Sequence, residues 1–242
     1  MENTSMENIL SLDAQIGHRI PREIIMRALG YKDPNSAGDA IRGLVDEHLN
    51  AVVAAAEPQV IYCGTAFNIT GNRVELPSGH VFTGKTLHQA VGKCDGLVVG
   101  LVTLGRKVDK AIAEASSQDA FCGYLMDVIS GLLVEMAAHQ FWQHLVGELS
   151  REGYKATSFV SPGAAGFPLV EQRQVFSFLK PERIGVSLTD SCLMEPTKSL
   201  TLIMGYGKDI VPAKHSHDCS TCDMEDCLIR GIHIDLTESN AG

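Results

Sequence analysis

Residues 119–151 carry the longest helical pattern in this chain, and any fold of the sequence must accommodate it. Apolar side chains recur there every three or four residues, which aligns them along one side of an α-helix. They include Phe121, Leu125, Val128, Ile129, Leu132, Met136 and Phe141. The uninterrupted apolar runs of the chain are short, such as 97–104. Because a bilayer span needs about 18 apolar residues, we expect no membrane-spanning segment.

Shorter elements surround this long helix without a regular alternation of strand and helix. Further helices are predicted at 21–30, 36–56, 83–93, 106–116 and 170–180, and strands at 60–69, 73–76, 96–105, 184–189 and 199–204. This mixture favours a single α+β domain over a doubly wound sheet. We expect an N-terminal extension at 1–20, the domain at 21–207 and a cysteine-rich tail at 208–242.

The charge balance and the N-terminus restrict the function and the compartment. The formal net charge is −9 with Lys and Arg scattered along the chain, so we expect no nucleic-acid partner. The first 20 residues lack the basic and apolar regions of a secretory signal. A cytoplasmic location is therefore expected, with the scattered cysteines as reduced thiols.

Four polar or small residues lie along one face of the long helix. Asp127, Gly131, Glu135 and His139 are spaced by four, which aligns them on an α-helix. Gly131 leaves room for a ligand or another backbone, so the row could contact a ligand. The alternative is a simple solvated face.

Two later segments are rich in polar or small residues. Residues 157–172 include the turn Ser161-Pro162-Gly163, whose small neighbours expose backbone groups that can bind a polar ligand. Residues 185–207 contain two strand-like runs flanking TDSCLMEPTK. An ordinary surface loop is the alternative interpretation of each.

Together these segments resemble a known family. The order runs from D-x7-E at 127–135, through S-P-G-x4-P-L-x-E-Q at 161–172, to G-V-x-L-T-[DE]-S-x-x-M-x-P-x-K-S at 185–199. It resembles the activation (reactivation) domain of cobalamin-dependent methionine synthase, and more closely its stand-alone bacterial relatives with cysteine-rich tails. The opening PREIIMRALGY at 21–31 is similar to theirs, so the resemblance covers roughly 20–230.

The resemblance implies a twisted, mainly antiparallel sheet with flanking helices and a site for S-adenosylmethionine. It also implies docking on a cobalamin-binding domain of a corrinoid methyltransferase, with flavodoxin or ferredoxin as electron donor. The family's acidic helix residue matches Glu135, with Asp127 as an aligned neighbour. The family's nucleotide-binding loop matches Ser161, Pro162 and Gly163.

Two positions depart from the family pattern. Phe159 stands where the family commonly has an arginine that can pair with the ligand carboxylate, and Ala164 stands where a tyrosine is usual. An arginine makes charge-assisted, bidentate contacts that a phenyl ring cannot make. The departures favour the alternative of an accessory protein that docks on a corrinoid protein without binding S-adenosylmethionine. A methyltransferase that uses a corrinoid protein as methyl carrier is the third alternative.

A cysteine motif follows these segments. Cys219, Cys222 and Cys227 lie within nine residues and are surrounded by polar side chains. This spacing is typical of zinc or iron–sulfur sites, which need a fourth ligand. His215 or His217 could complete a zinc site, and Cys192 could complete an all-thiolate site. A three-cysteine cluster with one open iron, a redox pair of Cys219 with Cys222 and free thiols remain alternatives.

Overall fold

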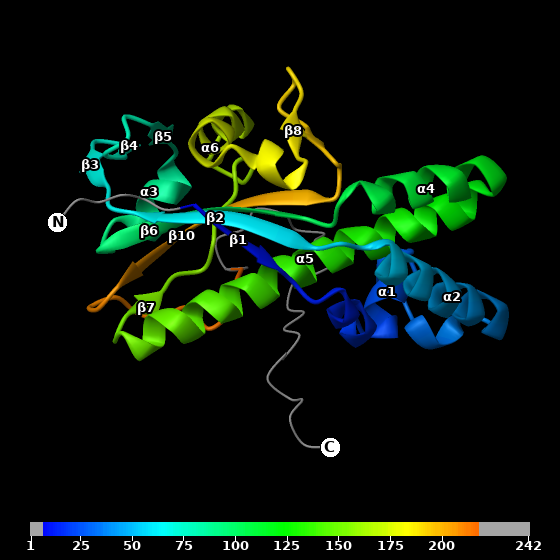
Figure 1. The fold of residues 1–242 in the computed structure, drawn as a ribbon. Coiled ribbons are helices and arrows are strands. Elements are labelled where there is room, and N and C mark those ends of the chain that lie inside the picture. The colour runs from blue at the N-terminus through cyan, green and yellow to red at the C-terminus, as the bar shows by residue number, and fades with distance from the viewer. Residues whose placement is uncertain (1–6, 218–242) are drawn as a thin grey trace.

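The computed structural model describes residues 7–217, which fold around a five-stranded sheet of order β1-β2-β6-β10-β7. Every pairing in this sheet is antiparallel. The strands are β1 (Asn8–Ser11), β2 (Gln59–Thr65), β6 (Gly96–Thr103), β7 (Lys155–Ala156) and β10 (Ser199–Gly207). Figure 1 shows the sheet as a layer with helices on both of its faces. The α+β class with flanking helices is confirmed.

The central strand β6 explains how one sheet supports two cores. All of its residues are buried, which suits its continuous apolar sequence GLVVGLVT. Because neighbouring side chains on a strand point to opposite faces, Val98 and Val102 belong to one core. Val99 and Leu101 belong to the other.

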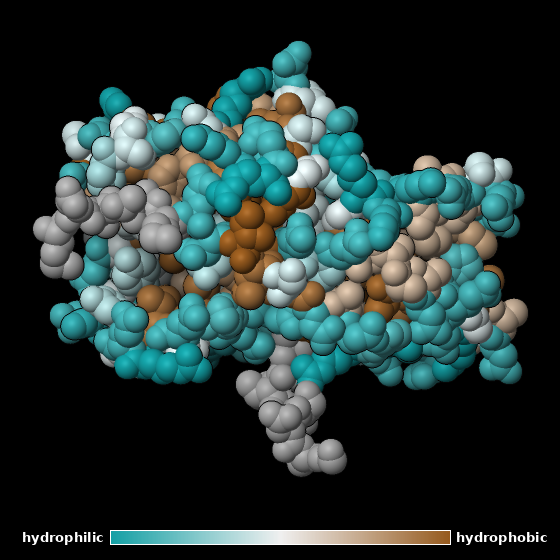
Figure 2. Space-filling view, viewed as in Figure 1, coloured by the Kyte–Doolittle hydropathy of each residue, from teal (hydrophilic) through white to brown (hydrophobic). Residues whose placement is uncertain are grey.

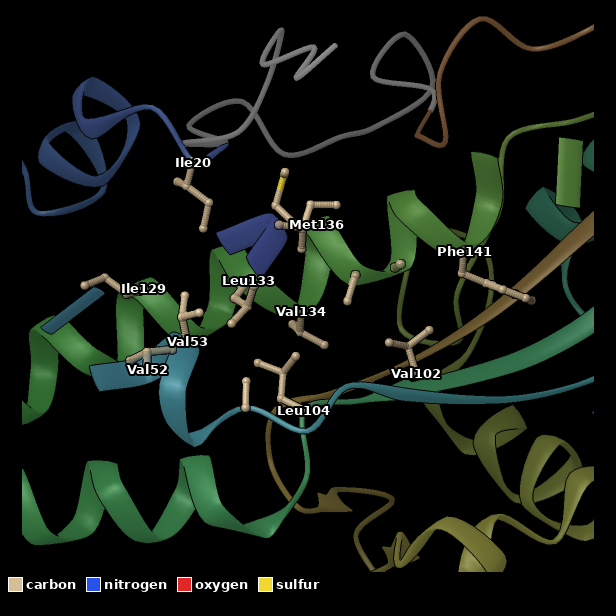
Figure 3. Packing of buried hydrophobic residues seen from close by; sticks show 14 of the residues in the cluster. Ile20, Val52, Val53, Val102, Leu104, Ile129, Leu133, Val134, Met136 and Phe141 are labelled. Carbon is tan, nitrogen blue, oxygen red and sulfur yellow. The ribbon is translucent and has the colours of Figure 1, made fainter. Parts of the chain in front are cut away.

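The first core lies between the sheet and the long helix α5 (Ala120–Arg151). The Asp119 side chain begins this helix by accepting hydrogen bonds from the backbone N–H groups of Phe121 and Cys122, the usual role of an N-cap residue. Three further helices pack beside it: α1 (Arg22–Ala28), α2 (Asp39–Ala55) and α4 (Arg106–Gln118). Figure 3 shows Val52 and Val53 of α2 facing Ile129 and Leu133 of α5.

By length and composition alone, α5 could cross a membrane. However, 56% of its most apolar window is buried inside the protein. Leu125, Ile129, Leu133 and Phe141 are fully buried, while Phe121 at the start of the helix is 40% exposed. The helix is therefore the core helix of this domain.

The second core covers the opposite face of the sheet. It is enclosed by α3 (Lys85–Val91), α6 (Gln172–Leu179) and the small sheet β3-β4-β5. The strands of that small sheet are β3 (Asn68–Thr70), β4 (Arg73–Glu75) and β5 (Val81–Thr83). Phe82 and Phe167 are among its fully buried side chains.

The expected N-terminal extension contributes to the main domain. Its residues form the edge strand β1 and the 3₁₀ helix η1 (Ala14–Arg19), and Ile16 and Ile20 are buried in the first core. In Figure 2 hydrophobic atoms reach the surface near the middle of the view, where β1 crosses it, and Ile9 of this strand is 43% exposed. Among the described residues, β1 is the terminal strand on this side of the sheet.

The remaining short elements connect these layers. They are the 3₁₀ helices η2 (Pro34–Ser36), η3 (Leu169–Glu171) and η4 (Pro181–Ile184) and the hairpin of β8 (Ser187–Leu188) with β9 (Met194–Glu195). All the predicted helices are present, with ends within a few residues of those expected. The strands β1, β5, β7 and β9 were not expected from the sequence.

Candidate functional site

The row of residues at 127, 131, 135 and 139 lies on α5, as its spacing predicts, and its three polar members contact later segments of the chain. At the N-terminal end of the row, Asp127 Oδ1 lies 2.7 Å from Lys198 Nζ. The Lys198 side chain is only 13% exposed, and that of Asp127 is 55% exposed. Asp127 therefore joins the helix to the segment that follows the β8–β9 hairpin.

Gly131 marks an open stretch in the middle of the row. A Cβ atom built on this residue would meet no atom of residues 7–217 within 4 Å, apart from the helix's own backbone. Glycine in a helix interior costs about 1 kcal/mol relative to alanine. The helix surface at Gly131 therefore has space beside it.

Glu135 contacts the start of the tail. Its Oε2 atom lies 3.1 Å from Nε2 of His217, and both side chains are partly exposed. The His217 ring also packs against the Phe159 ring, with the centroids 4.5 Å apart and the planes at 55°. Phe159 is 3% exposed and belongs to the first core. His217 thus links the acidic residue of α5 to the strand-like segment that leads into the 161–163 loop.

His139 occupies the last place in the row. Its Nδ1 atom lies 2.9 Å from Oγ of Ser216. Its ring stacks on Trp142 at a centroid distance of 5.8 Å. The indole N–H of Trp142 donates to the carbonyl of Thr157 at 2.9 Å. His139 and Trp142 therefore hold two segments, one around Thr157 and one around Ser216, against α5.

Those two segments are bonded to each other along their backbones. Ala213 N–H donates to Ala156 O at 2.9 Å, and Phe159 N–H donates to Ser216 O at 2.8 Å. The Ser158 hydroxyl donates to the carbonyl of His215 at 2.8 Å. The first part of the predicted tail therefore runs beside 156–159 and packs on α5. No periodic pattern in the sequence indicated this pairing.

The Ser161-Pro162-Gly163 turn follows this segment directly. Gly163 has φ +98°, and its N–H donates to Phe167 O at 2.8 Å. Pro162 is buried, whereas Gly163 and Ala164 are exposed. The hydroxyl oxygen of Ser161 is buried and finds no hydrogen-bond partner among residues 7–217. An unsatisfied buried hydroxyl is costly and calls for an explanation.

Two neighbours of this loop also have unsatisfied buried oxygens. Within the described part of the chain, Glu171 Oε2 and Gln172 Oε1 have no hydrogen-bond partner, and Gln172 is 5% exposed. Burial raises the pKa of the Glu171 carboxyl, which a hydrogen bond from the Thr83 backbone partly offsets. The segment 161–172 thus has three buried oxygen atoms without a hydrogen-bond partner among the described residues.

The third predicted segment, 185–207, forms the β8–β9 hairpin and the strand β10. Cys192 lies in the hairpin turn with φ +63° and is 5% exposed. After the hairpin, the N–H and hydroxyl of Thr197 both donate to the Asp109 carboxylate on α4, at 2.7 and 3.0 Å. The hairpin is therefore fixed to α4 through Thr197 and to α5 through Lys198.

The predicted metal ligands are only partly within the described residues. Cys219, Cys222 and Cys227 lie outside them. Within residues 7–217, no group of three or more His, Cys, Asp or Glu side chains could hold a metal ion. Cys192, His215 and His217 therefore form no metal site among themselves, and the metal remains a prediction about the cysteine motif.

No family model and no curated protein matches this chain. Among solved structures, it is similar to the crystal structure of the MetH reactivation domain bound to AdoHcy. The TM-score is 0.68 at 17% sequence identity, and the match covers 86% of this chain and 81% of that chain. This similarity shows the fold, and it agrees with the fold expected from the sequence motifs.

Proposed function

We propose that this protein activates a corrinoid-dependent methyltransferase by binding S-adenosylmethionine and presenting its methyl group to the cobalt of a partner's cobalamin. The main support is the meeting of two predicted site segments at one residue. Glu135 of α5 and Phe159, two residues before Ser161, both contact His217. The same fold occurs in a domain that was solved with AdoHcy, the product that remains when S-adenosylmethionine gives up its methyl group.

The proposed ligand lies along α5 between the Lys198–Asp127 pair and the His217–Glu135 pair. Asp127 and Glu135 are eight residues apart, which is about 12 Å along a helix. The space beside Gly131 lies midway between them. The Ser161-Pro162-Gly163 loop follows two residues after Phe159, and we propose that its backbone contacts the ligand. In this proposal Asp127 shapes the end of the site through Lys198, and Glu135 contacts the ligand.

The partner in this proposal is the cobalamin-binding domain of a corrinoid methyltransferase, reduced by flavodoxin or ferredoxin. Cobalt supplies the nucleophile for methyl transfer, so the protein needs no general base of its own. The contribution of this chain is to position the methyl donor. The cysteine motif at 219–227 is proposed to hold zinc or an iron–sulfur cluster.

Calorimetry with S-adenosylmethionine and with S-adenosylhomocysteine tests the ligand assignment. We expect binding to the full chain, and a loss of at least about tenfold in Glu135→Ala, because hydrogen bonds to charged groups contribute about 1.5–3 kcal/mol. Glu148→Ala is a matched control, since Glu148 lies on the same helix beside His144. No heat of binding at millimolar ligand would rule out the methyl-donor role.

The alternative is a metal-containing accessory protein that binds the corrinoid protein without a nucleotide. The observation that favours it is the buried, apolar Phe159 at the position of the family's arginine. It predicts that Glu135→Ala supports normal reactivation of the corrinoid enzyme, whereas Cys219→Ser loses both metal and reactivation. The two functions therefore give opposite results with Glu135→Ala.

A further inference from the structure

We infer that His217 and Glu135 act together as the binding site for an α-amino-acid group, the ammonium and carboxylate end of an adenosyl-amino-acid ligand. This inference rests on the proposed function and deepens it, because it assigns the ligand's amino-acid end to one place on the surface. Glu135 would accept hydrogen bonds from the ligand ammonium. His217 would donate a hydrogen bond to the ligand carboxylate.

The pairing of the two side chains carries this inference. His217 Nε2 and Glu135 Oε2 are 3.1 Å apart, and their side chains are 43% and 31% exposed. An amino-acid group carries an ammonium and a carboxylate on the same carbon, so it matches an adjacent acid and imidazole. The ligand would exchange the contact between the two residues for one contact to each of them. Neither residue would then be left without a partner, which limits the cost of separating them.

The position of His217 is fixed by its neighbours rather than by Glu135 alone. The ring rests on the buried Phe159 ring, with centroids 4.5 Å apart. The preceding residue, Ser216, is 7% exposed, accepts the N–H of Phe159 through its carbonyl and contacts His139 through its hydroxyl. A side chain that is held in place before binding loses little conformational entropy when the ligand arrives. These contacts hold the His217 ring in position before a ligand binds.

The surface beside the His217–Glu135 pair has room for the adenosyl part of such a ligand. On the same face of α5, the open space at Gly131 lies one turn before Glu135. The segment that carries Phe159 continues into the loop with the unsatisfied Ser161 hydroxyl. An amino-acid group bound at 135 and 217 would thus leave the adenosyl part free to lie toward Gly131.

Two ligands that differ only at this end give a direct test. S-adenosylhomocysteine carries the amino-acid group, and 5′-methylthioadenosine has the same adenosine thioether without it. Calorimetry would measure both ligands with the full-length wild type, with His217→Ala and with His217→Gln. We expect His217→Ala to weaken S-adenosylhomocysteine binding by about tenfold to hundredfold, the range for a charge-assisted hydrogen bond. We expect 5′-methylthioadenosine to bind the variant and the wild type equally, and the glutamine, which retains a donor, to recover part of the loss.

His144→Ala is the matched control. His144 lies on α5, and its Nε2 is 3.4 Å from Glu148 Oε1. The His144→Ala substitution therefore removes a similar histidine–glutamate pair outside the proposed site. Thermal melts establish that the variants are folded. An equal loss for both ligands would reduce His217 to a structural role, and unchanged binding would remove it from the site. Tighter binding in His217→Ala would mean that the residue covers Glu135 instead of binding the ligand. If the wild type binds neither ligand, the proposed function itself fails together with this inference.

Discussion

Lys198 Nζ lies 2.7 Å from Asp127 Oδ1, and this contact joins the segment after the β8–β9 hairpin to the long helix α5. The sequence motifs contain both residues, but they suggest Asp127 as a ligand neighbour. In the structure its carboxylate neutralises a lysine that is largely buried. The acidic row on α5 therefore has two tasks: Asp127 fixes the hairpin segment, and Glu135 meets the tail.

Removing this contact should destabilise the protein. Asp127→Ala leaves the ammonium of Lys198 without its partner while its side chain stays only 13% exposed. Because Asp127 itself is half exposed, we expect a loss of about 1–2 kcal/mol in the free energy of unfolding. Urea unfolding at neutral pH measures it. Asp46→Ala is the control, since Asp46 pairs with Arg22 at 2.6 Å with both side chains well exposed. If Asp46→Ala lowers the free energy of unfolding as much as Asp127→Ala does, the burial of Lys198 does not strengthen its contact with Asp127.

Gly131 offers a way to separate stability from ligand binding. A methyl group at this position meets nothing within 4 Å, so Gly131→Ala should stabilise the helix by about 0.5–1 kcal/mol. A larger side chain, as in Gly131→Leu, should fill the space that we assign to the ligand and weaken S-adenosylhomocysteine binding. Gly147 lies on the same helix with equally open surroundings. Gly147→Leu should leave binding unchanged, and equal effects at the two positions would rule out a ligand beside Gly131.

The thiol of Cys94 should make stability depend on alkaline pH. Burial, followed by the nearby charge of Asp95, raises its pKa from 9.0 to about 11. Below pH 9 the thiol is protonated in the folded and the unfolded chain, so it adds no pH dependence. Between pH 9 and 11 the unfolded chain loses this proton first, so the free energy of unfolding falls as pH rises. In denaturant unfolding between pH 9 and 11, the free energy of unfolding should fall less with rising pH in Cys94→Ala than in the wild type. If the free energy of unfolding falls with pH equally in both proteins, the raised pKa of the partly buried Cys94 thiol is contradicted.

The elements with strong periodicity were predictable, and the site was predictable only in part. The periodic spacing of apolar residues indicated α5, because a helix that is buried on one side repeats its apolar residues every three or four positions. The continuous apolar run at 97–104 indicated β6, because a short strand that is buried on both faces is apolar throughout. The strands that the sequence did not indicate are short: β1 has four residues, β5 has three, and β7 and β9 have two each. Such short segments owe their form to the partner strand rather than to their own sequence.

The contacts of His217 explain why the sequence did not indicate it as part of the candidate site. The row on α5 and the loop at 161–163 were identified from local spacing and from the motifs. His217 was considered only as a metal ligand because of the cysteines after it. Its contact with Glu135 spans 82 residues in sequence. That contact depends on the backbone pairing of Ala213 and Ser216 with the segment 156–159, which leaves no pattern in either segment.

The cysteine motif gives the last prediction. Three thiolates at Cys219, Cys222 and Cys227 are suited to zinc or an iron–sulfur cluster, so Cys222→Ser should remove the bound metal. Cys122→Ser is the control, because Cys122 is a free cysteine on α5, outside the motif. Metal analysis and an absorption spectrum of protein purified without oxygen measure the effect, since a cluster is coloured and zinc is not. Metal retained by Cys222→Ser, or absent from the wild type, would exclude a site at these cysteines. Because His217 contacts Glu135 in the described part of the chain, metal content that is unaffected in His217→Ala would separate the ligand site from the metal site.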